Sequence, residues 1–234
     1  MTTSTGRLRD PQQRAERAAR ILDTAADLLL RHGYRKVSID DVAAGAGIGK
    51  GTVYLHWKTR EQLFSAVFAR EVLAATGELR DALARDPSTC LLHRFARTYF
   101  LAVIGRPLLR GFLLTDPDLL GKLTSAPDTA RDERHAGVAL GYFELLARHG
   151  LLREGMSVEE VGYAYQATFE GFLRAEDGAD GRESRADLLA CVVERSLVRQ
   201  ERPEESVMGE VASATVALLD GLVDADREEF GIPA

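Results

Sequence analysis

Apolar residues recur at intervals of three and four along nearly the whole chain, which is the spacing that places side chains on one face of an α-helix. The first stripe of this kind consists of Ala18, Ile21, Leu22, Ala25, Leu28 and Leu29. Gly, Pro and acidic clusters interrupt the pattern at the intervals expected of helix ends. The periodicity therefore predicts an all-α fold.

The pattern divides the chain into segments of helical length. We expect the first helix to run from about Pro11, a favourable first-turn residue, to Arg31, with Gly33 beyond its end. Further helices are expected near 61–85, 89–104, 107–125 in two short pieces, 129–149, 157–175, 184–201 and 205–226. The breaks between them carry Pro87, Pro107, Pro127 and Pro203, and the acidic, glycine-bearing stretch 174–184 is expected to be a loop.

Two shorter helices are expected between residues 38 and 57. Ser38 can cap the first by accepting a hydrogen bond from the backbone near Asp41, and acidic residues in the first turn suit the positive end of the helix dipole. Gly47 is placed to adopt the left-handed conformation that ends this helix, and the next begins near Lys50. Two short helices joined by a tight glycine turn indicate a helix-turn-helix.

The glycine-rich stretch GAGIGKGT, residues 45–52, has nearly the composition of a phosphate-binding P-loop. That motif reads G-x-x-x-x-G-K-[ST], whereas Ala44 stands at the position of its first glycine and Gly51 at that of its Ser or Thr. Residues 37–44 also lack the β-branched run of a buried strand. The glycines are better explained by a backbone that bends between two helices and approaches a DNA phosphate.

Charge is unevenly distributed along the 234 residues, whose formal net charge is −6. Residues 1–60 contain 11 Lys and Arg against 6 Asp and Glu, and residues 61–234 contain 19 against 30. Only the first quarter is therefore suited to a polyanionic partner such as DNA.

The sequence also limits where the protein functions. The opening residues MTTSTGRLRDPQQR contain no apolar leader, and no stretch approaches the roughly 18 apolar residues of a membrane span. Cys90 and Cys191 are isolated thiols without C-x-x-C spacing, as expected of small core residues in a reducing cytosol. We therefore expect a soluble cytoplasmic protein without a membrane partner.

The stretch TAADLLLRHGYRKVSIDDVAAGAGIGKGTVYLHWKTREQLFSAV resembles the DNA-binding domain of the tetracycline-repressor (TetR) family of bacterial transcriptional regulators. The shared features are an Ala- and Leu-rich helix ending in HGY, a hydroxyl before the second helix, VAAGAGIGKGTVY across the turn, and then HW and KTREQLF. This resemblance covers about the first quarter of the chain. It implies a helix-turn-helix domain over residues 11–60 and a helical effector-binding and dimerisation domain over residues 61–230.

The resemblance further implies which residues face DNA: Ser38, Gly49, Lys50, Gly51, Thr52, Tyr54, His56 and Lys58. Their chemistry supports several of these roles, because Lys50 and Lys58 suit phosphates and Thr52 lies on the exposed face of a helix narrow enough for the major groove. Val53 and Trp57 are expected to pack that helix against the first one.

Two of these positions have alternatives, since Tyr54 could be a half-buried ring and His56 a structural histidine. Gly49 and Leu55 depart from the family pattern, which often has Ser and either Tyr or His there. These departures concern the operator sequence rather than the act of binding, because only contacts to base edges specify sequence.

Aromatic residues are concentrated in the middle of the chain, with ten of the fifteen Phe and Tyr between Phe95 and Phe172. Ligand pockets between helices are mostly apolar with a few polar groups, and Tyr provides both. We predict a pocket for a small-molecule effector, lined by Tyr99, Tyr142, Tyr165 and Phe169, with Gln166 or Glu170 as polar partner. The alternative is that these aromatic residues are ordinary core.

The last two helices carry apolar stripes wide enough to contact more than one neighbour. We predict a homodimer whose interface includes Leu188, Val192, Leu197, Val211, Leu218 and Leu222; the alternative is that both stripes face the chain's own core. A physical reason favours the dimer, because two recognition helices about 34 to 36 Å apart read successive major-groove faces of a palindrome.

The sequence shows no catalytic signature. It contains neither G-x-S-x-G nor H-E-x-x-H, and its five histidines lack metal-ligand spacing with each other or with either cysteine. We therefore expect no enzymatic activity, metal or cofactor, and predict a repressor that binds a palindromic operator and is released by a small-molecule effector. The alternatives from other classes are a P-loop-like nucleotide enzyme and a helical interaction module without DNA binding.

Overall fold

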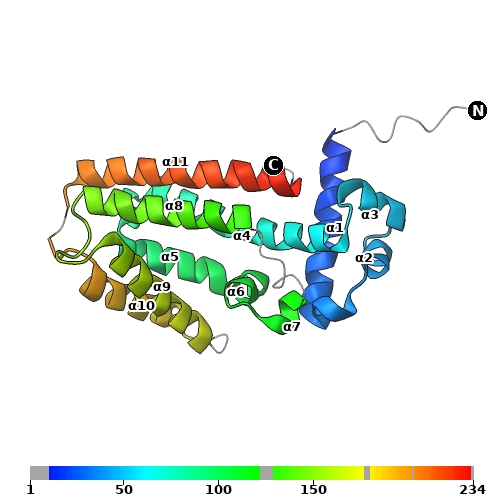
Figure 1. Ribbon diagram of the computed structural model, residues 1–234, viewed down its shortest axis with the longest axis horizontal. Helices are drawn as coiled ribbons and strands as arrows, with labels where there is room; N and C mark the ends of the chain where they lie inside the picture. The colour runs from blue at the N-terminus through cyan, green and yellow to red at the C-terminus, as the bar shows by residue number, and fades with distance from the viewer. Residues whose placement is uncertain (1–10, 122–128, 177–179, 202, 233–234) are drawn as a thin grey trace, which may run out of the picture. The chain divides into compact units, whose positions relative to one another are not determined.

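The computed structural model describes residues 11–121, 129–176, 180–201 and 203–232. Its helices, shown in Figure 1, are α1 (Pro11–His32), α2 (Ile39–Gly45), α3 (Lys50–His56), α4 (Arg60–Arg85), α5 (Leu92–Ile104), α6 (Pro107–Leu113), α7 (Pro117–Leu120), α8 (Thr129–Arg148), α9 (Val158–Ala175), α10 (Arg182–Leu197) and α11 (Glu205–Phe230). Short 3₁₀ segments occupy Tyr34–Lys36 and Pro87–Cys90. The predicted all-α fold is confirmed.

The helix bounds differ from the expectation mainly near the C-terminal end. Helix α10 ends at Leu197 rather than near residue 201, because Val198 is extended and forms an isolated antiparallel bridge with Leu152. Helix α11 continues to Phe230 instead of ending near residue 226. The expected break at Pro127 and the centre of the expected loop 174–184 lie outside the described residues.

The described chain forms two compact units. The first contains residues 11–72, 111–121 and 224–232, and the second contains residues 73–110, 129–176, 180–201 and 203–223. Each unit has its own set of fully buried side chains, among them Ile21, Leu22 and Phe64 in the first and Leu79, Phe100 and Val193 in the second.

Within the first unit, the residues that end α1 are fixed by close packing. Tyr34 is buried, its ring lies edge-on to Phe64 at 5.3 Å between centroids, and the Arg60 guanidinium lies 3.9 Å from the Tyr34 ring centroid. Gly33 has φ of 72°, and a Cβ there would lie only 2.8 Å from the backbone oxygen of Asp118. The HGY motif is thus explained by a left-handed turn followed by an anchoring ring.

Helix α2 is defined by its two ends. The expected Ser38 cap is present, since Asp41 N donates to Ser38 Oγ at 3.2 Å. Ser38 N also donates to the Asp41 carboxylate at 2.8 Å, which completes a capping box. At the other end Gly47 has φ of 67°, while Gly47 N donates to Ala44 O and Ile48 N to Ala43 O. These two bonds form a Schellman motif, which ends α2 and turns the chain toward α3.

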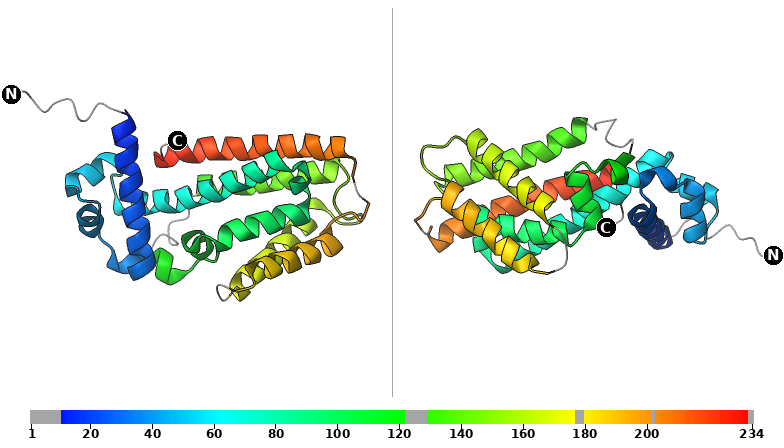
Figure 2. Two further views of the ribbon diagram at one scale, coloured as in Figure 1. Left: turned by 180° about the vertical axis from the view of Figure 1, so that it is seen from behind. Right: turned by 90° about the horizontal axis from the view of Figure 1, so that it is seen from below.

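The second unit is a bundle in which α5 packs against both α9 and α10, as the two views of Figure 2 also show. The connectors that follow α8 and α10 pair with each other. Arg153 N donates to Leu197 O at 2.9 Å, and Arg199 N donates to Leu151 O at 3.1 Å. This short pairing closes one end of the bundle.

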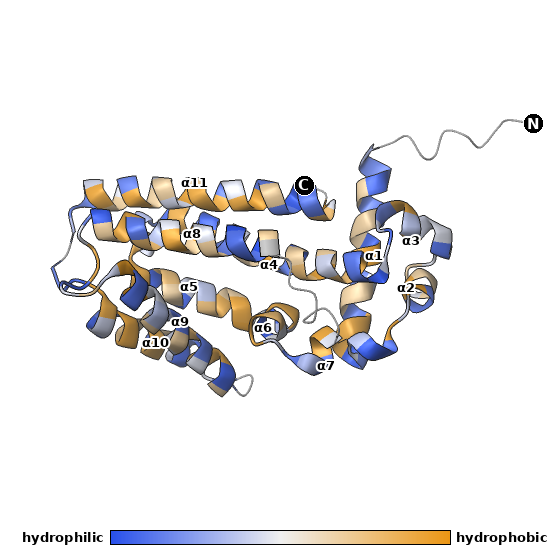
Figure 3. Ribbon diagram, in the orientation of Figure 1, coloured by the Kyte–Doolittle hydropathy of each residue, from blue (hydrophilic) through white to orange (hydrophobic). Residues whose placement is uncertain are grey.

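Helix α11 corrects one expectation from the sequence. Among the described residues it is long and apolar enough, by length and composition alone, to cross a membrane, whereas no such stretch was expected. Figure 3 shows apolar and polar residues alternating along it. Its apolar character has a packing explanation, because Val211, Ala212, Leu219, Leu222 and Val223 are all buried within the protein.

Gly47 should be required for the backbone conformation of the turn rather than for space. We expect Gly47→Ala to lower the free energy of unfolding by about 1 kcal/mol, because an L-residue is disfavoured in the left-handed conformation and a Cβ at residue 47 would meet no described atom within 4 Å. Gly51→Ala, in α3 and equally uncrowded, is the matched control and should stabilise the fold. Urea unfolding measures both; equal effects would contradict this explanation.

Candidate nucleic-acid interface and aromatic cluster

Helix α3 has one buried and one open side. Val53 is fully buried and Trp57, directly after the helix, is 4% exposed, so both predicted core positions are confirmed. The eight residues predicted to face DNA lie elsewhere: Ser38, Gly49, Lys50, Gly51, Tyr54 and Lys58 are exposed, and Thr52 and His56 are partly buried. Seven of the eight therefore lie on α3 or within two residues of its ends, and Ser38 caps α2.

Gly49 and Gly51 are not demanded by the folding of the described chain. Both have ordinary negative φ angles, and a Cβ at either position would meet no described atom within 4 Å. Gly51 even weakens α3, because glycine is a poor helix former. Bare backbone at these positions instead permits an external molecule to approach α3 closely.

The charged and hydroxyl side chains around α3 have partners within the chain. The Lys50 ammonium donates to Asp40 at 2.7 Å, and this hydrogen bond raises the pKa of Lys50. Lys58 Nζ donates to the backbone oxygen of Tyr54 at 3.3 Å. The Ser38 hydroxyl caps α2 and donates to Asp41, and these bonds lower the pKa of the Asp41 carboxyl. Because an ammonium group has three donors, Lys50 can contact a phosphate while it keeps Asp40 or after it releases Asp40.

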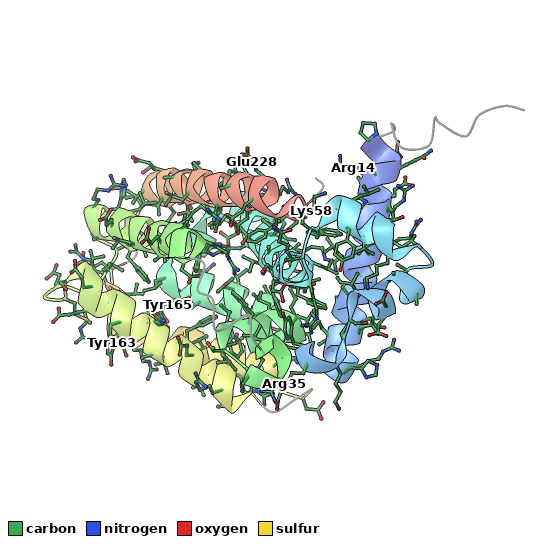
Figure 4. All side chains as sticks on the ribbon, turned by 45° about the vertical axis from the view of Figure 1, so that its right-hand side comes forward. Arg14, Arg35, Lys58, Tyr163, Tyr165 and Glu228 are labelled. Carbon is green, nitrogen blue, oxygen red and sulfur yellow. The ribbon has the colours of Figure 1, made fainter. Side chains whose placement is uncertain are left out.

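His56 lies beside Trp57, with 5.4 Å between ring centroids. Burial lowers the pKa of His56, and the positive charges of Arg14 and Arg17 lower it further, so the imidazole is neutral at pH 7. Sequence reasoning missed these two arginines, which come from the start of α1. Arg14 and Lys58 are labelled in Figure 4. The signal in the sequence that could have found them was that two basic residues stand three positions apart at the start of the first helix.

Trp57 also has a partner that the sequence did not indicate. Its indole N–H donates to the backbone oxygen of Phe230 at 3.2 Å, and Phe230 is the last residue of α11. Carbonyl groups in the last turn of a helix have no partner within that helix. This bond therefore satisfies two groups at once in a part-buried position.

A second group of predicted residues forms an aromatic cluster in the bundle of α5, α8 and α9. Tyr99 stacks on Phe169 at 5.5 Å between centroids, Tyr165 lies 5.7 Å from Phe169, and Tyr142 stacks on Phe95 at 4.4 Å. Phe143 connects this group of three to the Tyr142–Phe95 pair, since its ring lies 5.8 Å from Tyr142 and 5.6 Å from Tyr165. We refer to these six residues as the aromatic cluster.

The hydroxyl groups of the aromatic cluster differ in their surroundings. Tyr142 Oη donates to the backbone oxygen of Cys90 at 2.8 Å. Tyr165 Oη is buried and has no hydrogen-bond partner in the described part of the chain, and burial raises the pKa of this phenol. Burial likewise raises the pKa of Tyr99 to about 12. An unpartnered buried hydroxyl is costly, so Tyr165 is poised to bond a group that the chain itself does not supply.

The predicted polar partners of this cluster pair with each other on α9. Gln166 is exposed, and its amide donates to Glu170 at 3.0 Å along the surface of α9. Adjacent residues on a helix point about 100° apart, so Gln166 does not share the inward direction of Tyr165. Tyr163, which Figure 4 labels with Tyr165, is 79% exposed.

The residues predicted for a dimer interface fall into two groups. Leu188 and Val192 on α10 are 56% and 36% exposed, and Leu218 is half-buried. In contrast, Leu197, Val211 and Leu222 are already buried within the chain. The first group is therefore available to a partner subunit without any rearrangement of the chain.

The fold and the open side of α3 define the class: a helix-turn-helix DNA-binding domain attached to a helical bundle. Residues 21–67 match the family model described as bacterial regulatory proteins, tetR family. This match confirms, over residues 21–67, the resemblance drawn from the sequence.

Curated relatives agree over part of their length. The uncharacterized HTH-type transcriptional regulator Rv1556 of Mycobacterium tuberculosis is 38% identical over 81 residues, which are 32% of this chain and 40% of that protein. The HTH-type transcriptional repressor Rv3405c of the same organism is 35% identical over 114 residues, 48% of this chain and 58% of that protein. The matches span less than two thirds of these relatives.

Solved structures share the fold. NalD of Pseudomonas aeruginosa, described as the secondary repressor of the MexAB-OprM multidrug efflux pump, superposes with a TM-score of 0.58 at 20% identity, over 80% of this chain and 99% of its own. A complex of SmeT with triclosan gives a TM-score of 0.55 at 21% identity, over 81% of this chain and 100% of the SmeT chain. At these identities the similarities show the fold alone, and they extend over the bundle as well as the helix-turn-helix.

Two conservative substitutions should distinguish the tyrosines of the aromatic cluster. We expect Tyr165→Phe to raise the free energy of unfolding by about 1 kcal/mol, because it removes a buried hydroxyl that lacks a partner. Tyr142→Phe should lower the same quantity by about 1 kcal/mol, because it removes the donor to Cys90 O. Chemical unfolding of the ligand-free protein measures both changes, and a destabilised Tyr165→Phe would show that its hydroxyl has a partner.

Proposed function

We propose that the protein is a ligand-responsive transcriptional regulator that represses by binding a palindromic DNA operator as a homodimer and is released by a small-molecule effector. The observation that carries DNA binding is the open side of α3, where Gly49 and Gly51 leave the backbone bare beside Lys50 and Lys58. Residues 11–60 would form the DNA-binding domain, and residues 61–230 would bind the effector and the second subunit. The relatives named above are regulators rather than enzymes, in keeping with a cytoplasmic regulator.

The contacts with DNA divide by chemistry. Lys50, Lys58 and the hydroxyls of Ser38 and Tyr54 bind phosphates, and Thr52 with the exposed start of α3 reaches base edges in the major groove. Neutral His56 contributes a hydrogen bond rather than a charge. Phosphate contacts set the position of the protein, and Thr52 sets part of the sequence preference.

The effector site is the aromatic cluster. Its rings suit a planar apolar molecule, and the unpartnered Tyr165 hydroxyl supplies one directional hydrogen bond. SmeT, a protein of the same fold, is known in complex with triclosan, an observation that supports small-molecule binding by a protein of this fold.

Release from DNA then follows from a shift between two states. In one state the two recognition helices match the spacing of successive major grooves; in the other they do not. An effector that binds the second state more tightly by a few kcal/mol shifts the population toward it.

A salt titration tests the function as a whole. Affinity for duplex DNA should fall steeply as salt rises, because binding releases counterions from the phosphates. Magnesium-dependent ATP turnover without DNA affinity would instead support a nucleotide enzyme. Absence of both DNA affinity and ATP turnover would support a helical interaction module.

Lys50→Ala should weaken binding to all duplexes similarly and reduce the slope of log affinity against log salt by about 1, because one phosphate contact is lost. Asp40→Asn is the matched control: it frees Lys50 from its ion pair and should strengthen binding. Thr52→Val should change which sequence is preferred. Fluorescence anisotropy with specific and random duplexes measures all three, and unchanged affinity and preference throughout would remove this site assignment.

The homodimer should depend on the exposed apolar side chains of α10. We expect Leu188→Asp with Val192→Asp to give a monomer with greatly reduced operator affinity, since charges would be buried at the interface. Leu140→Asp, at a 45% exposed position on α8, is the control and should remain dimeric. Sedimentation velocity reports the state; a stable dimer in the double variant would place the interface elsewhere.

A further inference from the structure

The second unit contains a cavity of about 730 Å³ that is separate from the residues of the aromatic cluster. It lies where the connector after α10 pairs with the connector after α8, and it is bordered by residues 86–94, the end of α10 and the start of α11. Its volume is within the range of small-molecule sites, roughly 300 to 1,000 Å³.

The lining of this cavity is amphiphilic. Four buried side chains supply an apolar surface: Leu91, Leu151, Val198 and Met208. The charged groups comprise the carboxylates of Asp86, Glu194, Glu201 and Glu205 and the guanidinium groups of Arg94 and Arg199. Among these described lining residues, carboxylates outnumber guanidinium groups around an apolar floor.

Both guanidinium groups already have carboxylate partners. Arg94 lies 3.1 Å from Asp86, and Arg199 lies 2.7 Å from Glu201. An anionic ligand would have to displace these carboxylates to reach either arginine. Among the described lining residues the charge that remains is negative, and it comes from Glu194 and Glu205.

His93 does not neutralise that charge. Its Nε2 lies 3.7 Å from Glu194, and burial lowers the pKa of His93, so the imidazole is mainly neutral at pH 7. Its Nδ1 is buried and has no hydrogen-bond partner within the described ranges. Glu194 is thus an uncompensated carboxylate beside an imidazole that can form a further hydrogen bond.

From this arrangement we infer that the cavity is a second ligand site, distinct from the aromatic cluster, and that it takes amphiphilic organic cations: a protonated amine on a hydrocarbon or aryl body. The ammonium group binds between Glu194 and Glu205, and the body packs on Leu151, Val198 and Met208. His93 bonds a polar atom of the ligand or a water that bridges to it.

Three probes of similar shape and different charge test the ligand class: phenylbutylamine, phenylbutanol and phenylbutyrate. In calorimetric titrations without DNA, the amine should bind at least about fivefold more tightly than the alcohol, and the preference should shrink as salt rises. The butyrate should bind most weakly. Equal affinities, tighter binding of the butyrate, or no binding of the amine would overturn the inference.

Substitutions test the place of binding. Glu194→Gln should weaken the amine about fivefold, and the double variant with Glu205→Gln should weaken it further. Glu144→Gln, an exposed carboxylate on α8 outside the cavity lining, is the control and should bind like the wild type. NMR signals of the His93 ring and the Met208 methyl group should shift on addition of the amine.

Tyr165→Phe separates this site from the effector site. Tyr165→Phe should leave amine binding unchanged. If Tyr165→Phe abolished amine binding while Glu194→Gln left it unchanged, the amine would be assigned to the aromatic cluster and the inference would be overturned. Because no duplex is present, the result is independent of whether the chain binds an operator.

Discussion

The burial of Val53 and Trp57 fixes the orientation of α3. A helix of seven residues is not stable alone, because its nucleation cost is spread over too few hydrogen bonds, so its position must come from packing. The Schellman turn at Gly47 sets where the helix enters, and the bond from Trp57 to Phe230 fixes the residue that follows it. Everything on the opposite side, including Lys50 and Tyr54, is left accessible as a consequence.

Much of this arrangement was predictable because it is locally encoded. Helix periodicity, the Ser38 cap and the left-handed Gly47 each depend on residues within a few positions of one another. The remainder depends on partners distant in sequence. Phe230 lies 173 positions from Trp57, and the early end of α10 follows from pairing with the connector after α8. No local pattern specifies which distant carbonyl or strand-like residue will be adjacent.

In the candidate sites, too, some features were predictable from the local sequence and others depend on residues distant in sequence. Composition indicated where aromatic residues gather, and the structure brings Tyr99, Tyr142, Tyr165 and Phe169 into one cluster. The periodicity could not settle which of two adjacent apolar residues faces inward: Leu188 is exposed while Leu189 is fully buried. Nor could it reveal that the Tyr165 hydroxyl lacks a partner, because that depends on every neighbour at once. The roles of the site residues and the dimer interface stay predictions.

Trp57 is the chain's single tryptophan. Indole emission depends on the polarity and hydrogen bonding of its immediate environment, and here both are set by the junction between the end of α3 and the last turn of α11. When tryptophan is excited selectively, the emitted light therefore originates at one defined place in the molecule. Rapid-mixing spectroscopy on unlabelled protein can follow events beside α3 in real time.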